Sequence, residues 1–306
     1  MKRFLLIILV LGGLQSLRAQ DPAIFNHYVV SPILINPSYA GFEEMHILQA
    51  NFRNQWTGFP GAPLTYGFNY HGPIGKTLGV GFNVLGENIA SITRLRFQLN
   101  YAFRYQIGKN VKLAAGFSTE CSNLQLNNTA LDNPFYEAGD ELIDAFNSGE
   151  SILDATLGVY AMFSERTYLG LSFPNLIVAK ISDIESGDPE GAFFKFFIFN
   201  VGHRFQFDNG FSFEPSLMMR QVMNVPFNLD FNAKVGFLED RFIAGLSYRT
   251  GVGGALGVLL GTEFDNFRLF YSYDLSFQQF QQYNSGAHEL TLGLKFGKRK
   301  GSNNYN

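Results

Sequence analysis

The sequence predicts an all-β fold: a transmembrane antiparallel β-barrel of the outer-membrane type, with about 14 strands and both termini on the periplasmic side. Three observations lead to this prediction. Apolar and polar residues alternate over long runs, short and long links between these runs alternate along the chain, and no apolar run reaches the roughly 20 residues that a membrane-spanning helix needs. The composition agrees, since 46% of the 306 residues are hydrophobic but only 16% are charged, and the mean hydropathy is +0.00.

The beginning of the chain has the pattern of a secretory signal peptide. Lys2 and Arg3 precede the apolar run Phe4 to Leu14, and small and polar residues lead to Ala19. We expect cleavage after Ala19, so that residues 1–19 form the signal peptide; a short buried helix is the alternative.

Cysteine usage is compatible with an exported barrel. Cys121 is the single cysteine of the sequence, so no internal disulfide can form. Closure of a barrel, with every backbone group hydrogen-bonded between strands, would supply stability instead.

The clearest alternation runs from Ile92 to Gln106, and similar runs occur at residues 227–235, 267–277 and 289–296. In the first run aromatic and aliphatic residues occupy one face, and arginine, glutamine and asparagine occupy the other. The run exceeds the roughly 9–11 residues of a membrane-spanning strand, whereas strands of soluble domains usually have about 5–6. A soluble all-β sandwich would also alternate, so length alone does not exclude it.

The lengths of the links separate the two alternatives. The predicted short links are residues 71–76, 108–110, 164–166, 208–210, 238–241 and 265–266. The predicted long links are residues 57–62, 86–90, 123–150, 174–191, 222–226, 251–254 and 279–286. Strict alternation of the two kinds favours an outer-membrane barrel, which has short periplasmic turns and longer extracellular loops. We therefore expect the barrel over residues 44–297, and a tail over residues 298–306.

Two segments of the predicted barrel are ambiguous. Residues 192–205 carry Phe on both faces, so their register is open. The long link 123–150 has room for a short helix over residues 139–146 at the barrel mouth.

The polar faces of the predicted strands would line the lumen. Those residues are Arg94, Arg96, Arg104, Asp230, Lys234, Arg268, Asp274 and Glu289, joined by Arg53, Arg220, Arg249, Lys295, Glu214 and Glu263. This mixture predicts ion pairs that brace the wall, because guanidinium groups form planar pairs with carboxylates. A pore that favours anions is the alternative, because basic residues outnumber acidic ones.

The sequence contains no recognisable catalytic, cofactor-binding or metal-binding motif. The five histidines do not pair at metal-ligand spacing, and no GxSxG motif is present. An acidic cluster, Asp132, Glu137, Asp140, Glu141 and Asp144, does not have the spacing of a calcium loop. We expect no enzyme and no cofactor, although a hydrolase with a Ser–His pair built across strands is left open. A net charge of −3 argues against a nucleic-acid partner.

Two sequence motifs lie near the beginning of the mature chain. The first comprises Gln20-Asp21-Pro22-Ala23-Ile24-Phe25-Asn26-His27-Tyr28, then Pro32, then Asn36-Pro37-Ser38-Tyr39-Ala40-Gly41. The second is Arg53-Asn54-Gln55-Trp56-Thr57-Gly58-Phe59-Pro60-Gly61-Ala62-Pro63. Both resemble the opening of the PorP/SprF family of type IX secretion system outer-membrane proteins in Bacteroidota. Gly72-Pro73-Ile74-Gly75 is similar more loosely, and Ser38 stands where family members commonly have Ala.

The resemblance implies a barrel in the outer membrane of a Gram-negative bacterium that serves protein export. Its implied partners are a secreted or surface protein with a C-terminal sorting domain, gliding adhesins included, other type IX secretion components, and outer-membrane lipid. The resemblance does not identify the cargo. A passive diffusion channel is the alternative function.

The two motifs also have a physical interpretation. Three prolines exclude residues 20–43 from the barrel wall, so this segment is either a plug in the lumen or a periplasmic arm. Trp56 to Pro63 would form a stiff aromatic hook on the first extracellular link, and it would contact either a partner or the barrel rim. The candidate partner-binding or plug residues are Tyr28, Asn36, Pro37, Tyr39, Gly41, Arg53, Asn54, Gln55, Trp56, Phe59 and Pro60.

Overall fold

The computed structural model describes residues 25–126, 149–180, 194–223, 225, 227–251, 254–277 and 283–297. The expected signal peptide, the short helix at 139–146, the acidic cluster and the C-terminal tail lie outside these residues. Among the described residues, no helix combines the length and the apolar character needed to cross a bilayer.

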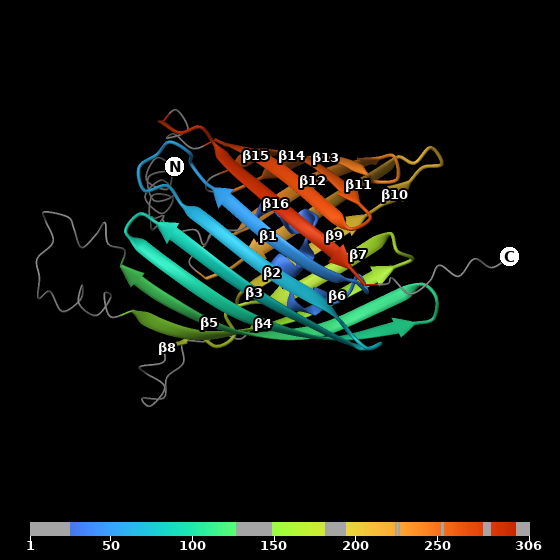
Figure 1. The fold of residues 1–306 in the computed structure, drawn as a ribbon, viewed down its shortest axis with the longest axis horizontal. Helices are drawn as coiled ribbons and strands as arrows, with labels where there is room; N and C mark the ends of the chain where they lie inside the picture. Colours follow the sequence, from blue (N-terminus) through green and yellow to red (C-terminus); the bar gives the residue numbers. More distant parts are fainter. Residues whose placement is uncertain are drawn as a thin grey trace, which may run out of the picture.

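The described residues form sixteen strands in one antiparallel sheet that closes on itself (Figure 1). The strands are β1 His46–Asn54, β2 Leu64–Ile74, β3 Leu78–Ile89, β4 Ile92–Ile107, β5 Val111–Leu126, β6 Glu150–Phe163, β7 Thr167–Phe173, β8 Ala179–Lys180, β9 Phe197–His203, β10 Phe205–Gln206, β11 Ser212–Gln221, β12 Asn228–Phe237, β13 Phe242–Arg249, β14 Ala255–Phe264, β15 Phe267–Ser276 and β16 Ala287–Phe296.

The wall of the barrel contains fourteen strands, because two short strands continue longer ones. β8 pairs with β6 beyond the end of β7, and β10 pairs with β11 beyond the end of β9. The sheet closes where β1 pairs with β16, with His46 opposite Phe296, and where β9 pairs with β11. The predicted closed antiparallel barrel of about 14 strands is confirmed.

The connections between strands sort onto the two ends of the barrel. At one end, which we call the short-turn end, the described links are residues 75–77, 108–110, 164–166, 207–211, 238–241 and 265–266. The opposite end, which we call the long-loop end, carries the links that begin after β1, β3, β5, β8, β11, β13 and β15. Both β1 and β16 meet the short-turn end, so the wall begins and ends there (Figure 1).

One predicted long link is wrong. Residues 86–89 belong to β3, and only Ala90 and Ser91 connect β3 to β4. Ala90 adopts a positive φ of 50°, which permits so tight a hairpin. The strand continues because residues 86–88 pair with both β2 and β4, and the inward-facing Glu87 lies 3.5 Å from a guanidinium nitrogen of Arg96.

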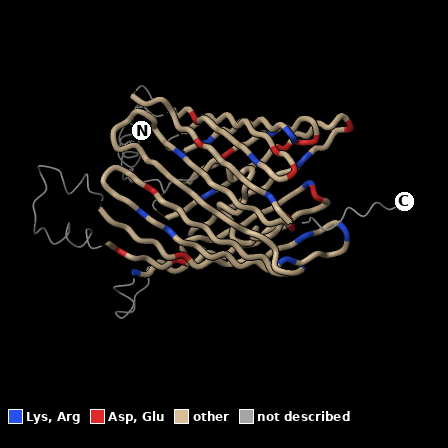
Figure 2. The backbone as a smooth tube through the Cα atoms, in the orientation of Figure 1, with Lys and Arg blue, Asp and Glu red and all other residues tan. Residues whose placement is uncertain are grey.

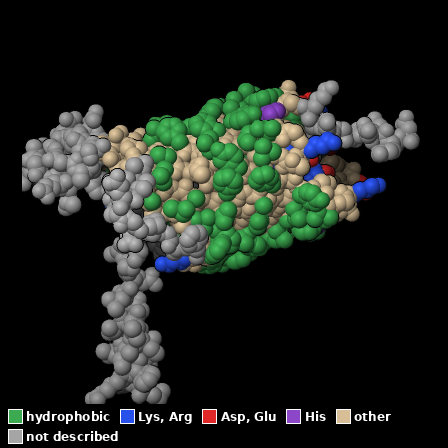
Figure 3. Space-filling view, turned by 90° about the horizontal axis from the view of Figure 1, so that it is seen from below, with side chains coloured by type: hydrophobic (Ala, Val, Ile, Leu, Met, Phe, Trp, Pro, Cys, Tyr) green, Lys and Arg blue, Asp and Glu red, His purple; other side chains and the backbone are tan. Residues whose placement is uncertain are grey.

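The two faces of the wall differ as the alternation predicts. On β4, the outward Phe103 is 62% exposed and the inward Arg104 is 9% exposed. Figure 3 shows apolar side chains across the outer surface between the two ends, and Figure 2 shows charged residues at the turns of the short-turn end. This distribution is that of a surface made for lipid around a polar interior.

The structure settles the register of the ambiguous segment. In β9, Ile198, Asn200 and Gly202 are buried and face inward, whereas Phe197 and Phe199 point outward. Phe194 precedes the strand and packs edge-on against Phe173.

The cost of a charge on the outer face should depend on its depth in the membrane. Leu99→Arg places a cation near the middle of β4 on the lipid face, and we expect it to lower the free energy of unfolding in phospholipid vesicles by about 2–4 kcal/mol. Tyr105→Arg, close to the short-turn end of the same face, should cost about 0–1 kcal/mol. Denaturant titration of both variants measures the difference, and equal costs would contradict a lipid-facing β4.

Candidate functional site

Residues 25–45 lie inside the barrel, and we call them the plug segment (Figure 1). They contain three short 3-10 helices: η1 Asn26–Val29, η2 Pro32–Leu34 and η3 Pro37–Tyr39. Pro32 and Pro37 each begin a helix, where a missing N–H leaves no hydrogen bond unmade. The segment starts in the half of the lumen nearer the long-loop end and crosses to the short-turn end, where β1 begins.

Asn36 ties η3 to the wall. Its side-chain oxygen accepts hydrogen bonds from the Ser38 backbone N–H at 3.0 Å and the Ser38 hydroxyl at 2.6 Å. Its side-chain nitrogen donates to the backbone oxygens of Val159 on β6 and Leu171 on β7, at 2.9 and 3.3 Å. Asn36 therefore caps a helix and bridges two strands with one carboxamide.

Pro37 to Gly41 follow a strip of wall made of glycines. A Cβ atom added to Gly158 would lie 2.2 Å from the Asn36 side-chain oxygen, and one added to Gly116 would lie 2.6 Å from the Ser38 Cα atom. A Cβ atom on Gly79 would lie 1.9 Å from the Ala40 oxygen. Sequence reasoning missed these glycines. The available signal was their inward register on the predicted strands.

Tyr39 and Gly41 complete the contact near the short-turn end. The ring of Tyr39 is buried and lies 5.4 Å from Phe42 and 5.0 Å from Tyr160, centroid to centroid. Gly41 has a φ of +67° and accepts a 2.7 Å hydrogen bond from Arg104 through its carbonyl oxygen.

Glu43 anchors the end of the plug segment through an ion pair with Arg268. Burial by itself raises the pKa of Glu43, but the neighbouring Arg268 outweighs it and holds the pKa below its ordinary value. The carboxylate is therefore charged at neutral pH. Arg268 pairs also with Glu263, which lies 3.1 Å from Lys295.

The other end of the plug segment rests on Glu289 of β16. One carboxylate oxygen accepts the Asn26 backbone N–H at 2.7 Å, and the other accepts that of His27 at 3.0 Å. Arg53 bridges Glu289 and Asp274, with 3.0 Å to each. Asn26 and His27 were not predicted as site residues, and their hydrogen bonds to strands more than 200 positions away leave no local sequence signal.

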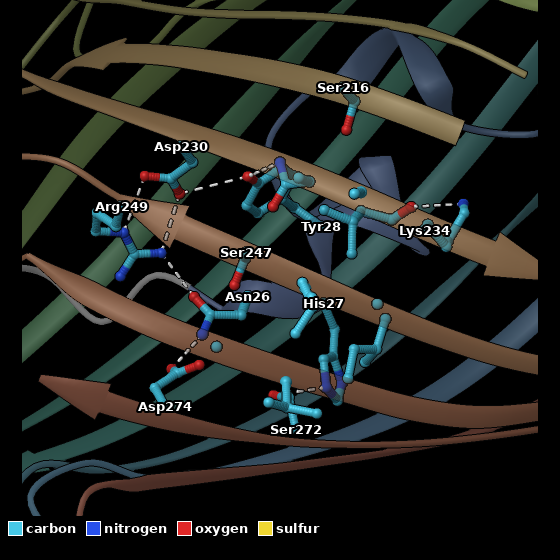
Figure 4. Close-up of a pocket in the computed structure, with 18 of the residues that line it drawn as sticks. Asn26, His27, Tyr28, Ser216, Asp230, Lys234, Ser247, Arg249, Ser272 and Asp274 are labelled. Atoms are coloured by element: carbon cyan, nitrogen blue, oxygen red, sulfur yellow. Dashed lines mark hydrogen bonds and ion pairs between the residues drawn. The ribbon is translucent and has the colours of Figure 1, made fainter. Parts of the chain in front are cut away.

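Tyr28 joins this end of the plug segment to β12 (Figure 4). Its hydroxyl donates to Asp230 at 3.3 Å, and Arg249 pairs with the same carboxylate at 3.0 Å. Lys234 pairs with Glu214 at 2.9 Å and donates to the Val29 backbone oxygen at 3.3 Å. The charges of this region are therefore matched within the lumen and hold the plug segment.

Arg94 and Arg96 of β4 lie on the inward face nearer the long-loop end. Arg96 pairs with Glu87 at 3.5 Å and with Glu120 at 3.2 Å, and Arg94 lies 3.8 Å from Glu87.

The residues of the second motif, Arg53 to Pro63, lie in different parts of the structure. Arg53 faces the lumen, and Asn54 ends β1 in the wall opposite His288. Beyond them the Gln55 N–H donates to the Pro63 oxygen at 2.9 Å, which closes the link. Trp56, Phe59 and Pro60 lie on that link at the long-loop end, away from the plug segment.

The aromatic link is held to its neighbour. The Thr57 N–H donates to the Gly286 oxygen and the Ser285 N–H donates to the Thr57 oxygen, both at 2.8 Å. Trp56 takes a positive φ of 55°, and Phe59 is 45% exposed.

Two large cavities lie beside the plug segment. One, of about 840 Å³, lies on the long-loop side and is lined by Ile33, Ile35 and Pro37 of the plug segment. The other, of about 670 Å³, lies on the short-turn side and is lined by Tyr39, Phe42 and other residues. Within the described part of the chain, no cluster of three His, Cys, Asp or Glu side chains is arranged to hold a metal.

The family model for the type IX secretion system membrane protein PorP/SprF matches residues 17–294. The chain belongs to the PorP/SprF family. This PorP/SprF protein is therefore a type IX secretion system membrane protein with an outer-membrane β-barrel, located in the outer membrane, and its family is not an enzyme family. In that setting the short-turn end faces the periplasm.

Among solved structures, one membrane channel shares the fold and two further proteins are more loosely similar. The CymD monoaromatic hydrocarbon channel has a TM-score of 0.52 and 9% identity, over 90% of this chain and 94% of that one. The KdgM porin has a TM-score of 0.41 and 8% identity, over 82% and 99%. The toluene transporter TodX of Pseudomonas putida has a TM-score of 0.47 and 10% identity, over 90% and 94%. No curated protein matches the chain.

The glycine strip predicts how the plug segment can be dislodged. Gly116→Val forces atoms into the Ser38 backbone, and such overpacking costs about 1–3 kcal/mol, so hydrogen exchange of the Asn36–Gly41 amides should accelerate about tenfold or more. Gly86→Val is the matched control, because the nearest atom to its added Cβ is 4.0 Å away. Unchanged exchange in the Gly116 variant would show that the plug segment does not depend on this contact.

Proposed function

We propose that this PorP/SprF protein is a docking component of type IX secretion. It binds a secreted or surface protein that carries a C-terminal sorting domain, gliding adhesins among them, and supports the export or surface attachment of that protein. The observation that carries the proposal is the plug segment, which fills the middle of the lumen and is tied to the wall at both ends.

The plug segment argues against the alternative, a passive diffusion channel. A channel needs a continuous aqueous path, whereas here a folded segment occupies the middle of the lumen between two cavities. Arg53, Glu289 and Asp274 are paired with each other or with the plug segment, so they do not form a free charged lining. This arrangement supports a barrel that binds its partners at its two ends.

The long-loop end offers a surface for such a partner. Phe59 and Pro60 are exposed on a link whose backbone is held by hydrogen bonds to residues 285–286. Rigid exposed aromatic rings are favourable contacts at interfaces because little conformational entropy is lost on binding. Other type IX components would meet the short-turn end, on the periplasmic side.

Gene deletion tests the docking role. We expect a particular surface protein to remain in the periplasm or to be released to the medium, as measured by quantitative proteomics of surface, periplasm and medium. Complementation with Phe59→Ser should restore surface attachment about tenfold less well, which corresponds to about 1.4 kcal/mol of lost binding. Phe59→Tyr, which keeps an aromatic ring at the same exposed position, is the control and should complement fully. Correct placement of all surface proteins in the deletion strain would contradict the proposal.

Planar-bilayer recording separates docking from diffusion. The intact protein should be electrically silent, whereas deletion of residues 21–41 should open a steady conductance because the two cavities then join. If the deletion variant fails to fold, Gly116→Val serves as a second variant because it keeps the chain intact. It should give intermittent openings. A steady open pore in the intact protein would favour the diffusion channel.

A further inference from the structure

The cavity on the long-loop side, which we call the long-loop cavity, is bounded on one side by the plug segment. Ile33, Ile35 and Pro37 line it from the plug segment, and Asn36 beside them is hydrogen-bonded to the backbones of β6 and β7. Its volume of about 840 Å³ is in the range of ligand pockets, about 300–1,000 Å³. Because the plug segment occupies the middle of the lumen, a cavity of this size beside it suits the end of a chain better than a chain that passes through.

In the long-loop cavity, Arg94 makes weaker ion pairs than its neighbour Arg96. Arg96 is matched by Glu87 and Glu120, at 3.5 and 3.2 Å. Arg94 keeps 34% of its side chain exposed, and its ion pair among the described residues is a 3.8 Å contact with Glu87. That distance is too long for a hydrogen bond. The Arg94 guanidinium therefore has donors available to a carboxylate.

Two carboxamides in the same cavity present acceptors. Asn69 on β2 and Asn83 on β3 are directly opposite each other and line the cavity. Their nitrogens donate to Asn51 at 3.1 Å and to Gln98 at 2.7 Å. Their oxygens are buried and have no partner among the described residues, and Asn69 is only 2% exposed. Buried acceptors without partners are costly, and rotation of the two carboxamides toward the cavity would let N–H groups of a ligand satisfy them.

The remaining lining mixes apolar and polar side chains. Ile152 of β6, Ile198 of β9 and Met218 of β11 lie in it together with the isoleucines of the plug segment, and Glu120 and Asp154 contribute carboxylates. A ligand that matches the whole cavity has a carboxylate, N–H donors and apolar side chains. The carboxyl-terminal end of an extended peptide has all three.

We propose that the long-loop cavity receives the carboxyl-terminal residues of the partner protein, with the terminal carboxylate on Arg94 and backbone N–H groups on Asn69 and Asn83. The inference rests on the proposed function and names the site at which the partner is held.

The test uses the full protein purified in detergent and a fluorescein-labelled pentapeptide, Thr-Val-Thr-Val-Ile, with either a free carboxylate or a carboxamide. Fluorescence anisotropy should show about ten- to a hundredfold tighter binding of the carboxylate form, as expected for a hydrogen-bonded ion pair. Arg94→Gln should abolish the preference and Arg94→Lys should keep part of it. Glu87 keeps its ion pair with Arg96 in both variants, so the wall should still fold. Arg241→Gln, exposed in a turn of the short-turn end, is the control and should keep the full preference.

Equal binding of the two peptides, or an undiminished preference in Arg94→Gln, overturns the inference. Decanoate is a second probe: if it binds in an Arg94-dependent manner and the peptide does not, the cavity holds a small anionic amphiphile, and the peptide assignment is wrong. The export phenotype of the deletion strain is independent of these results. A phenotype without a peptide preference overturns only the site, and a preference without a phenotype overturns only the docking role.

Discussion

The structure depends on one constraint: inside a bilayer, every backbone N–H and C=O must find a partner within the protein. The antiparallel sheet meets it by pairing its first strand with its last, His46 opposite Phe296, and by pairing β9 with β11 on the other side of the barrel sequence. Closure then imposes two opposite faces on each strand. The outer face is apolar because it meets lipid, and the inner face is polar because it encloses a space that must be filled by water, side chains or more of the chain.

The plug segment fills that space with two kinds of contact. At η1 the contact is ionic and polar, since Glu289 accepts two backbone N–H groups and Arg53 neutralises it together with Asp274. At η3 the contact is steric, since glycines of the wall let Asn36, Ser38 and Ala40 approach the strands closely. Buried ion pairs alone would add little net stability, because desolvation offsets their attraction. Here they specify where the plug segment begins, and the glycine strip specifies where it lies.

Because the plug segment occupies the middle of the lumen, the surfaces at the long-loop end are the ones open to a partner outside the cell. With the middle of the lumen occupied, the proposed recognition regions are the exposed link around Phe59 and the long-loop cavity beside Arg94. The two regions belong to the same end of the barrel and differ in chemistry, one an exposed aromatic edge and the other an enclosed site with a guanidinium and two carboxamides. A partner that carries both a folded domain and a free carboxyl terminus could engage them together.

The sequence by itself determined the elements that depend on neighbouring residues. The alternation from Ile92 to Gln106 predicted β4 and its two faces, because side-chain direction in a strand follows position alone, and the prolines excluded residues 20–43 from the wall. Only the tertiary structure decided between a plug and a periplasmic arm, divided Arg53 from Trp56, and extended β3 through Glu87. Those outcomes depend on partners far away in the chain, such as Glu289 for Asn26 and Gly158 for Asn36, and a register between distant strands leaves no local pattern to read.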